Sequence, residues 1–211
     1  MKITPAKKRS NSKIEIPSVL GAPFQGGFYA GRLNVEDIEY AIIVAPKAEG
    51  EHGDTQWNTD TKLVNGALSY NDGLTNTTAM AKAGSQLAQW TCGLKIGGFN
   101  DWYLPSQDEL ELCYRHLKPS TDKNYCWARS GINLSAVPPT RPYTPDVPKQ
   151  TKAKAFKKGG TQAFDQVWHW TSTQHAAAPA YAWVQYFGYG DQGNVHKSNG
   201  YRARAVRRIK I

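Results

Sequence analysis

The residues best suited to acid–base chemistry are three carboxylates that stand close together in the sequence: Asp101, Asp108 and Glu109. A pair of such groups can give and take a proton at one substrate. Each also has a competing structural role. Glu109 follows Ser106 by three residues, the spacing of a helix capping box, and Asp108 falls in the first turn, where the helix dipole favours an anion. We therefore expect these carboxylates to hold a shape and not to catalyse a reaction.

A second candidate is the pattern G-x-G-x-x-G at Gly188, Gly190 and Gly193, which in a dinucleotide-binding fold leads into a helix. The residues that follow, NVHKSNG, do not open a helix, and too little chain remains for a βαβ unit, so we predict hairpin glycines. No histidine has a zinc-site spacing. His169 lies between two tryptophans and is expected to pack in the interior and not to act with His175. No enzyme activity, metal or cofactor is predicted.

Near the C-terminus the chain is rich in Tyr, Asn, Gln and Gly. Such side chains are typical of binding loops, because rigid aromatic rings give a large contact area at a small entropy cost. Alternate aromatic residues, such as Trp183 and Phe187, are expected to be core. The predicted ligand-binding surface consists of Tyr181, Gln185, Tyr186, Tyr189, Gln192, Asn194, Asn199 and Tyr201.

The net charge of +9 is unevenly placed. Segments 1–16, 137–160 and 201–211 together carry more positive charge than the whole chain, so the remainder is acidic. This pattern fits docking onto acidic partners at least as well as nucleic-acid binding, which we do not expect. The predicted docking residues are Lys7, Lys8, Arg9, Lys149, Lys152, Lys154, Lys157 and Lys158.

The elements that position these residues can be traced along the chain. GFYAGRL and EYAIIVAP predict two strands, and the polar span 47–65 predicts a loop. Apolar spacing predicts one helix over 75–94, capped by Thr75, Asn76 or Thr77. A stiff corner, GGFNDWYLP, then enters an amphipathic helix over 106–118.

Later segments predict short strands and one long excursion. Prolines recur at every third position from Pro139 to Pro148, the period of polyproline II, so 137–160 is expected to be exposed and extended. VWHWTSTQ and AYAWVQYF predict strands, and 202–211 predicts one strand with a bulge at Val206–Arg207. The chain is thus divided into a basic N-terminal arm, 1–22, and one domain, 23–211.

Cysteine use and hydropathy bound the setting. Cys92, Cys113 and Cys126 have no metal-ligand spacing, and their odd number argues against a disulfide framework, so buried thiols made in a reducing cytoplasm are expected. No apolar run is long enough to span a membrane, so membrane insertion is not expected. Glu15 and Pro17 interrupt the apolar segment that follows the basic N-terminus, so a cleavable secretion signal is not expected either.

Four motifs in this order, GGFNDWYLPSQDELELCY, WHWTSTQ, AWVQYF and RARAVRRI, resemble those of the Legionella collagen-like protein C-terminal domain family. The resemblance covers roughly 26–209 and implies an α+β, C-type-lectin-like fold, with two helices packed on short twisted antiparallel strands and long loops. This fold is related to those of formylglycine-generating enzymes and phage variable proteins. The scaffold residues that the resemblance implies are Asp101, Trp102, Leu104, Pro105, Ser106, Glu109, Trp170 and Ser172.

The resemblance does not carry over an activity. Formylglycine-generating enzymes need a late cysteine pair, and no cysteine follows Cys126. The Glu-Pro-Asn and Gln-Pro-Asp signatures of calcium-dependent sugar binding are also absent from the sequence. The segments GGFYAGR and IVAPKAEGE look like those of phage or prophage proteins.

We therefore predict a non-enzymatic virion protein of a tailed bacteriophage, made in the host cytoplasm. Its lectin-like module would attach to a host receptor from the tail fibre or baseplate. One alternative is a structural or decoration protein that docks on capsid or tail subunits through its basic arm. Another is a bacterial surface adhesin that binds glycans. The expected partners are other virion proteins, a host cell-surface glycan or protein, and copies of the chain itself, for example in a trimer.

Overall fold

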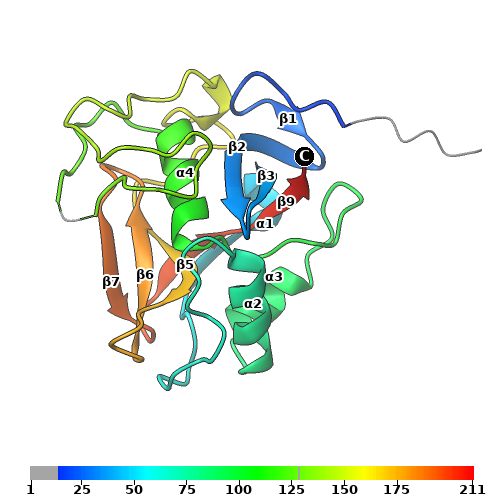
Figure 1. Ribbon diagram of the computed structural model, residues 1–211, viewed down its shortest axis with the longest axis vertical. Helices are drawn as coiled ribbons and strands as arrows, with labels where there is room; N and C mark the ends of the chain where they lie inside the picture. The colour runs from blue at the N-terminus through cyan, green and yellow to red at the C-terminus, as the bar shows by residue number, and fades with distance from the viewer. Residues whose placement is uncertain (1–13, 128) are drawn as a thin grey trace, which may run out of the picture.

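Two curled sheets and a few short helices form the computed structural model, which describes residues 14–127 and 129–211 (Figure 1). The first sheet joins the two ends of the described chain in the order β1-β2-β3-β9, and all its strands are antiparallel. Its strands are β1 (Pro23–Phe24), β2 (Gly27–Val35), β3 (Ile38–Val44) and β9 (Val206–Lys210). β2 and β3 are the two strands predicted from GFYAGRL and EYAIIVAP. The turn between them places Glu36 and Asp37 at positive φ, as tight hairpins require.

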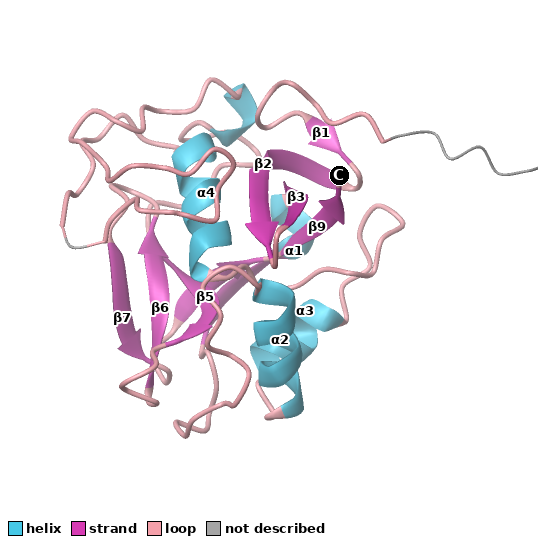
Figure 2. Ribbon diagram, in the orientation of Figure 1, coloured by secondary structure: helices cyan, strands magenta, loops and turns pink. Residues whose placement is uncertain are grey.

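The second sheet has the order β4-β8-β5-β6-β7, and its pairs are antiparallel except for β5 with β8. Figure 2 shows its strands β5, β6 and β7 side by side. Its strands are β4 (Glu51–Thr55), β8 (Tyr201–Arg204), β5 (Trp168–Gln174), β6 (Tyr181–Tyr186) and β7 (Gln192–His196). β6 and β7 form a hairpin, and Gly190 in its connection has φ +83°. The prediction of hairpin glycines is therefore confirmed.

The prediction of a single bulged C-terminal strand is wrong. The chain leaves the second sheet after Arg204 and enters the first sheet at Val206, so Ala205 links the two. Its amide donates to the Gly50 carbonyl and its carbonyl accepts from the Ala45 amide. Strand β8 of the second sheet thus continues into strand β9 of the first. The break in the alternation of apolar and basic residues at Val206 marks the point where the chain passes from one sheet to the other.

Five short helical segments lie in the described part of the chain. They are α1 (Lys47–Gly50), α2 (Gly73–Lys82), α3 (Gln86–Cys92), α4 (Gln107–Leu117) and the 3-10 turn η1 (Lys154–Phe156). α1 and β4 lie in the span that we predicted to be only a loop. The single helix predicted over 75–94 is two helices, because Gly84 turns the chain at φ +88° and Ser85 caps a new helix. Its predicted caps are also wrong: Asp72 caps α2 by accepting from the Thr75 amide.

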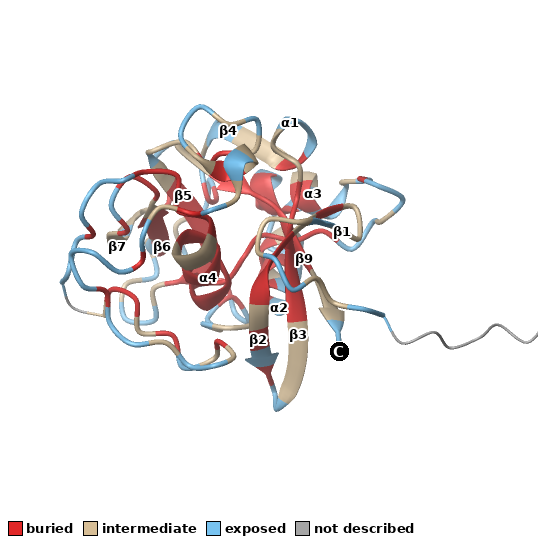
Figure 3. Ribbon diagram, turned by 90° about the horizontal axis from the view of Figure 1, so that it is seen from above, coloured by how far each residue is buried: buried red, intermediate tan, exposed pale blue. Residues whose placement is uncertain are grey.

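α4 is the central helix, and the capping box predicted at its start is confirmed. Leu110, Cys113, Tyr114 and Leu117 are buried in the largest core cluster. The helix packs on β5 and β6 and is buried along most of its length (Figure 3). An amphipathic helix was expected. Instead its polar first turns are also enclosed, so their charged groups need partners within the protein.

The excursion at 137–160 is largely exposed, as predicted, but four of its residues are buried and tie the segment to the domain. Tyr143 and Phe156 are buried in the same core cluster as α4, and Pro148 and Thr151 are buried as well. The Tyr143 hydroxyl donates to Glu111 Oε1 at 3.0 Å. A few apolar anchors thus fold the segment back over α4. Most of its docking lysines remain at the surface: Lys149, Lys152, Lys154 and Lys158 are exposed, and Lys157 is half-buried.

The structure also bears on the predictions for the cysteines, the basic arm and membrane insertion. Of the three free cysteines, Cys113 is buried, whereas Cys92 and Cys126 are exposed, so the prediction of three buried thiols is wrong. Lys7, Lys8 and Arg9 of the basic arm lie outside the described residues. Within the described part of the chain, no helix has the length and apolar character needed to cross a membrane.

Candidate recognition site

The corner before α4 is a hydrogen-bonded frame. Glu109 Oε2 accepts from the Ser106 amide at 2.7 Å, and Glu109 Oε1 accepts from the Tyr103 hydroxyl at 2.6 Å. The Ser172 amide of β5 donates to the Pro105 carbonyl at 2.8 Å, which ties the corner to the second sheet. The Thr77 hydroxyl donates a hydrogen bond to the Leu104 carbonyl, and Thr77 Oγ1 accepts one from the Leu104 amide.

The remaining scaffold residues fix the ends of this frame. Arg207 forms a two-pronged ion pair with Asp101, at 2.7 and 2.9 Å. Trp102 is buried beside it, and the Arg207 guanidinium lies over the ring at 5.9 Å. Trp170 is also buried and donates its indole N–H to the Thr55 carbonyl at 2.8 Å. These groups therefore hold the corner and the sheet together.

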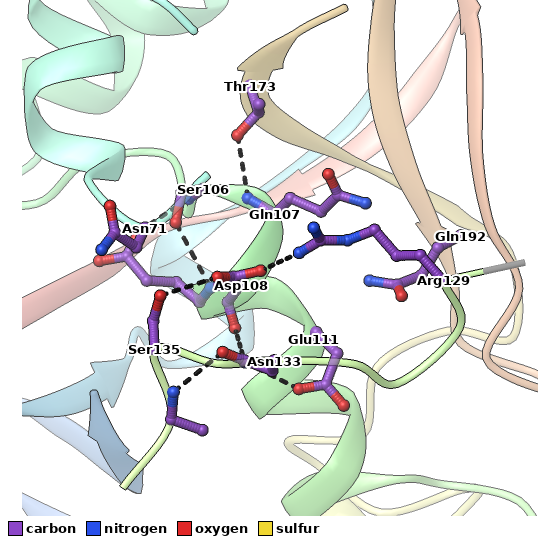
Figure 4. A network of polar contacts seen from close by, with 12 residues as sticks. Asn71, Ser106, Gln107, Asp108, Glu111, Arg129, Asn133, Ser135, Thr173 and Gln192 are labelled. Atoms are coloured by element: carbon purple, nitrogen blue, oxygen red, sulfur yellow. Dashed lines mark hydrogen bonds and ion pairs between the residues drawn. The ribbon is translucent and has the colours of Figure 1, made fainter. Parts of the chain in front are cut away.

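A second network, shown in Figure 4, attaches the segment after residue 128 to the first turn of α4. Asp108 pairs with Arg129 and accepts from the Ser135 hydroxyl at 2.9 Å. Asn133 Nδ2 donates to the Asp108 carbonyl at 2.8 Å and to Glu111 Oε2 at 2.9 Å. Burial raises the pKa values of Asp108 and Glu111, while Arg129 opposes the rise at Asp108. The network thus fixes both carboxylates in place.

Beside this network, β6 and β7 present one face with alternating side chains. Tyr181 pairs with His196 across the two strands, Trp183 with Asn194, and Gln185 with Gln192. Opposed residues of a strand pair point to the same side, so these six side chains share one surface, which we call the amide face. It runs from exposed Tyr181 to buried Gln185.

The inner end of the amide face gathers polar atoms that have no hydrogen-bond partner in the protein. Gln107, the first residue of α4, is 1% exposed, and both atoms of its amide are unpaired. Gln185 Oε1, Gln192 Nε2, Trp183 Nε1 and Arg129 Nε are unpaired too. Buried polar groups are nearly always satisfied, so such a concentration needs an explanation.

These residues are neighbours in space as well as in kind. Figure 4 shows the side chains of Gln107, Arg129 and Gln192 lying close to one another. The amide of Gly131 donates to Gln192 Oε1 at 3.1 Å, which holds that side chain against the segment carrying Arg129. Arg129 also covers the Tyr70 ring, 4.7 Å from its centroid. Tyr70 in turn lies 6.3 Å from Trp183, between ring centroids.

The structure divides the predicted ligand-binding surface. Tyr181, Gln185, Gln192 and Asn194 lie together on the amide face. The other members, which lie elsewhere, are Tyr186, Tyr189, Asn199 and Tyr201. Tyr186 projects from the opposite side of β6, where its ring lies 4.4 Å from that of Tyr189. Asn199 bonds Tyr201, whose ring packs on Trp170 at 5.2 Å.

Sequence reasoning missed five members of the site: Gln107, Arg129, Tyr70, Trp183 and His196. Trp183 was expected to be core, but it is only half-buried, whereas Phe187 is fully buried as expected. The alternation of Tyr181, Trp183 and Gln185 along one strand could have placed Trp183 on this surface. No local signal marks Gln107, because only the packing of α4 on the sheet buries it.

The fold and this site define a class: an α+β domain in which a rigid sheet presents an aromatic and amide surface, with its carboxylates held in structural bonds. The model of the family described as "Lcl C-terminal domain" matches residues 51–207, and the chain belongs to that family. No curated protein matches the chain.

One similar solved structure is a fimbrial protein from Bacteroides ovatus, at 12% sequence identity and a TM-score of 0.42. The match covers 79% of this chain and 35% of that one, so the chain spans about a third of its length.

Proposed function

We propose that this chain is a non-enzymatic recognition module with a C-type-lectin-like fold, carried in the tail fibre or baseplate of a tailed phage. It attaches the particle to a glycan or protein on the host-cell surface. The observation that carries the proposal is the amide face, where unpaired hydrogen-bonding groups and partly exposed aromatic rings stand on a rigid hairpin. Large rings with short amides are what recognition surfaces use, because ordering them on binding costs little entropy.

Binding is favoured over catalysis by the state of the nearby carboxylates. A general acid or base must reach the proton that it transfers. Asp108 is held by Arg129 and Ser135, and Glu111 accepts from Arg115 at 2.9 Å. Glu109 is enclosed in the frame of the corner. Each carboxylate is thus committed to bonds that support the site.

A docking role is the second candidate, and one observation favours it. Four lysines, Lys149, Lys152, Lys154 and Lys158, are exposed on a segment that Tyr143 and Phe156 anchor to the core. A fixed basic patch of this kind suits acidic subunits of a particle, or other copies of the chain with acidic surfaces. The two roles use different residues and are compatible in one virion protein.

The proposed attachment is tested with two matched tyrosines. Tyr181 and Tyr189 are both 39% exposed, but only Tyr181 is on the amide face. We expect Tyr181→Ala to weaken binding of the fluorescently labelled full chain to intact host bacteria at least tenfold, and Tyr189→Ala to leave binding near wild type. Equal binding by the two variants, or a loss confined to Tyr189→Ala, would refute the amide face as the attachment surface.

A further inference from the structure

Three adjoining cavities follow residues 14–20, which begin the described chain, and together we call them the trough. Their volumes are about 460, 430 and 490 Å³. Cavities of about 300–1,000 Å³ are typical of sites that bind ligands. The first two share Ile16, Arg32 and Ile211 as walls, and the last two share Ser18, Leu20 and His116. A row of cavities suits a linear ligand with several anchoring groups better than one compact molecule.

The walls of the trough are apolar and partly open to solvent. Ile14 and Ile211 are each 42% exposed, and Val19 is 64% exposed. Leu20 and Ala153 line the same cavity as Val19, and Figure 1 shows the start of the described chain, in blue, beside the yellow segment around residue 150. Apolar side chains that gather along one hollow mark an interaction site, whereas single ones scattered over a surface do not.

The charge of the trough is positive and unbalanced. Lys149, Lys152 and Lys210 are exposed and line it, and none of them forms an ion pair within residues 14–127 and 129–211. The acidic residue among the lining groups is Glu39, and Arg32 holds it at 2.7 Å. A partner with carboxylates would therefore meet cations that have no counter-charge within the described chain.

The same charge argues against the chain's own basic arm as the occupant. Residues 1–13 carry five Lys or Arg and no acidic residue. Like charges brought together repel one another, so neither this arm nor that of a second copy suits the trough.

The main chain along the trough favours a peptide over other acidic ligands. Within the described residues, positions 14–18 form no main-chain hydrogen bond, although the chain is not helical there. An extended peptide can pair its own N–H and C=O groups with such a segment, as in recognition by strand addition. Its alternate side chains then point toward the cavities and toward the rim.

We propose that the trough binds an extended acidic segment of another protein, in which apolar residues alternate with Asp or Glu. The apolar side chains fill the cavities, and the carboxylates pair with Lys149, Lys152 and Lys210. The inference rests on the docking role given above as the second candidate function. It deepens that role, because it assigns the partner's chemistry and separates these lysines from Lys154 and Lys158, which line none of the three cavities.

Binding is tested by fluorescence anisotropy of the full chain with labelled ten-residue peptides at physiological salt. A peptide of alternating Leu and Glu should bind about tenfold more tightly than one of alternating Ser and Glu, because only the first has apolar groups for the cavities. A peptide of alternating Leu and Lys should not bind. Equal affinity for the two acidic peptides would mean that the surface responds to charge alone, and the inference falls.

Two matched pairs of variants locate the binding. Lys149→Gln with Lys152→Gln should weaken binding of the Leu–Glu peptide about tenfold, and Lys154→Gln with Lys158→Gln should leave it near wild type, although each pair removes two charges from one exposed segment. Val19→Asp should weaken binding, whereas Val167→Asp, at another exposed valine, should not.

Two outcomes separate the trough from the functions on which it builds. Equal losses for the two lysine pairs, or no binding by the Leu–Glu peptide, would overturn the trough as the docking site. If the lysine variants nevertheless fail to enter particles, docking through the basic segment stands without the trough. Host-cell attachment through Tyr181 is measured independently and does not depend on either result.

Discussion

The carboxylate of Glu109 accepts a hydrogen bond from the backbone amide of Gly73, at 3.1 Å and across 36 residues of sequence. The same oxygen accepts from Ser106. A Cβ at position 73 would lie 2.3 Å from this oxygen, so the close approach requires glycine. One buried carboxylate thereby joins the starts of α2 and α4. It accepts three hydrogen bonds in all, from the Gly73 amide, the Ser106 amide and the Tyr103 hydroxyl.

This relationship ranks two substitutions in the frame. Ser106→Ala removes one cap and should cost about 1 kcal/mol of unfolding free energy. Glu109→Ala leaves three buried donors unpaired and should cost at least about 3 kcal/mol, because each unsatisfied group costs about 1–3 kcal/mol. Urea unfolding measures both values. Glu49→Ala, at an exposed acidic position in α1, serves as the control, and similar losses for Ser106→Ala and Glu109→Ala would contradict the bridging role.

A buried histidine makes stability depend on pH. His169 is fully buried, and burial lowers its pKa to about 3. A folded pKa below the unfolded value of about 6.5 means that the unfolded chain binds the proton first, so stability is full above pH 6.5 and falls as the pH drops below it. We expect a slope approaching about 1.4 kcal/mol per pH unit from this group.

Comparison with His169→Phe isolates that slope. The unfolding free energy of the variant should depend less steeply on pH between 6.5 and 5, even if its value at pH 7 is lower through loss of the bond to the Val167 carbonyl. His116, whose pKa is also lowered by burial, remains in both proteins and cancels. Parallel pH curves for the two proteins would show that His169 is not the group responsible.

The cysteines should react in two classes. Burial raises the pKa of Cys113 strongly and leaves it no solvent contact, so it is neither exposed nor ionised in the native state. A thiol-reactive dye should label Cys92 and Cys126 in native protein and Cys113 only after denaturation, as mass spectrometry of peptides would show. Rapid native labelling of Cys113 would contradict its position in the core.

The basic segments should matter for assembly and not for folding. Changing Lys149, Lys152, Lys154 and Lys158 to Gln, or deleting residues 1–13, should weaken incorporation into particles, and salt should weaken it in wild type because it screens such contacts beyond about 8 Å. Melting temperatures should stay within a few degrees of wild type for the lysine variant. Normal incorporation of both variants in a particle-assembly assay would exclude docking through these segments, whatever the outcome for Tyr181.

The sequence by itself determined the local elements whose signals lie within a few residues. Ser106 and Glu109 predict the capped start of α4, and the alternating pattern of β2 and β3 predicts two strands, because caps and pleats depend on nearest neighbours. Even for local elements the prediction was incomplete, because the turn at Gly84 divides a helix that apolar spacing alone had predicted to be continuous.

Tertiary structure decided which residues share a surface and which polar groups lack partners. The step at Ala205 between sheets, the burial of Tyr143 and Phe156, and the enclosure of Gln107 all arise from contacts between distant segments. Half of the predicted ligand-binding residues fall on the amide face because they share one hairpin. Tyr186 lies one residue beyond Gln185 on β6, so its side chain points to the opposite face of the sheet. Burial is a property of the packed chain, so no local pattern could have identified Gln107.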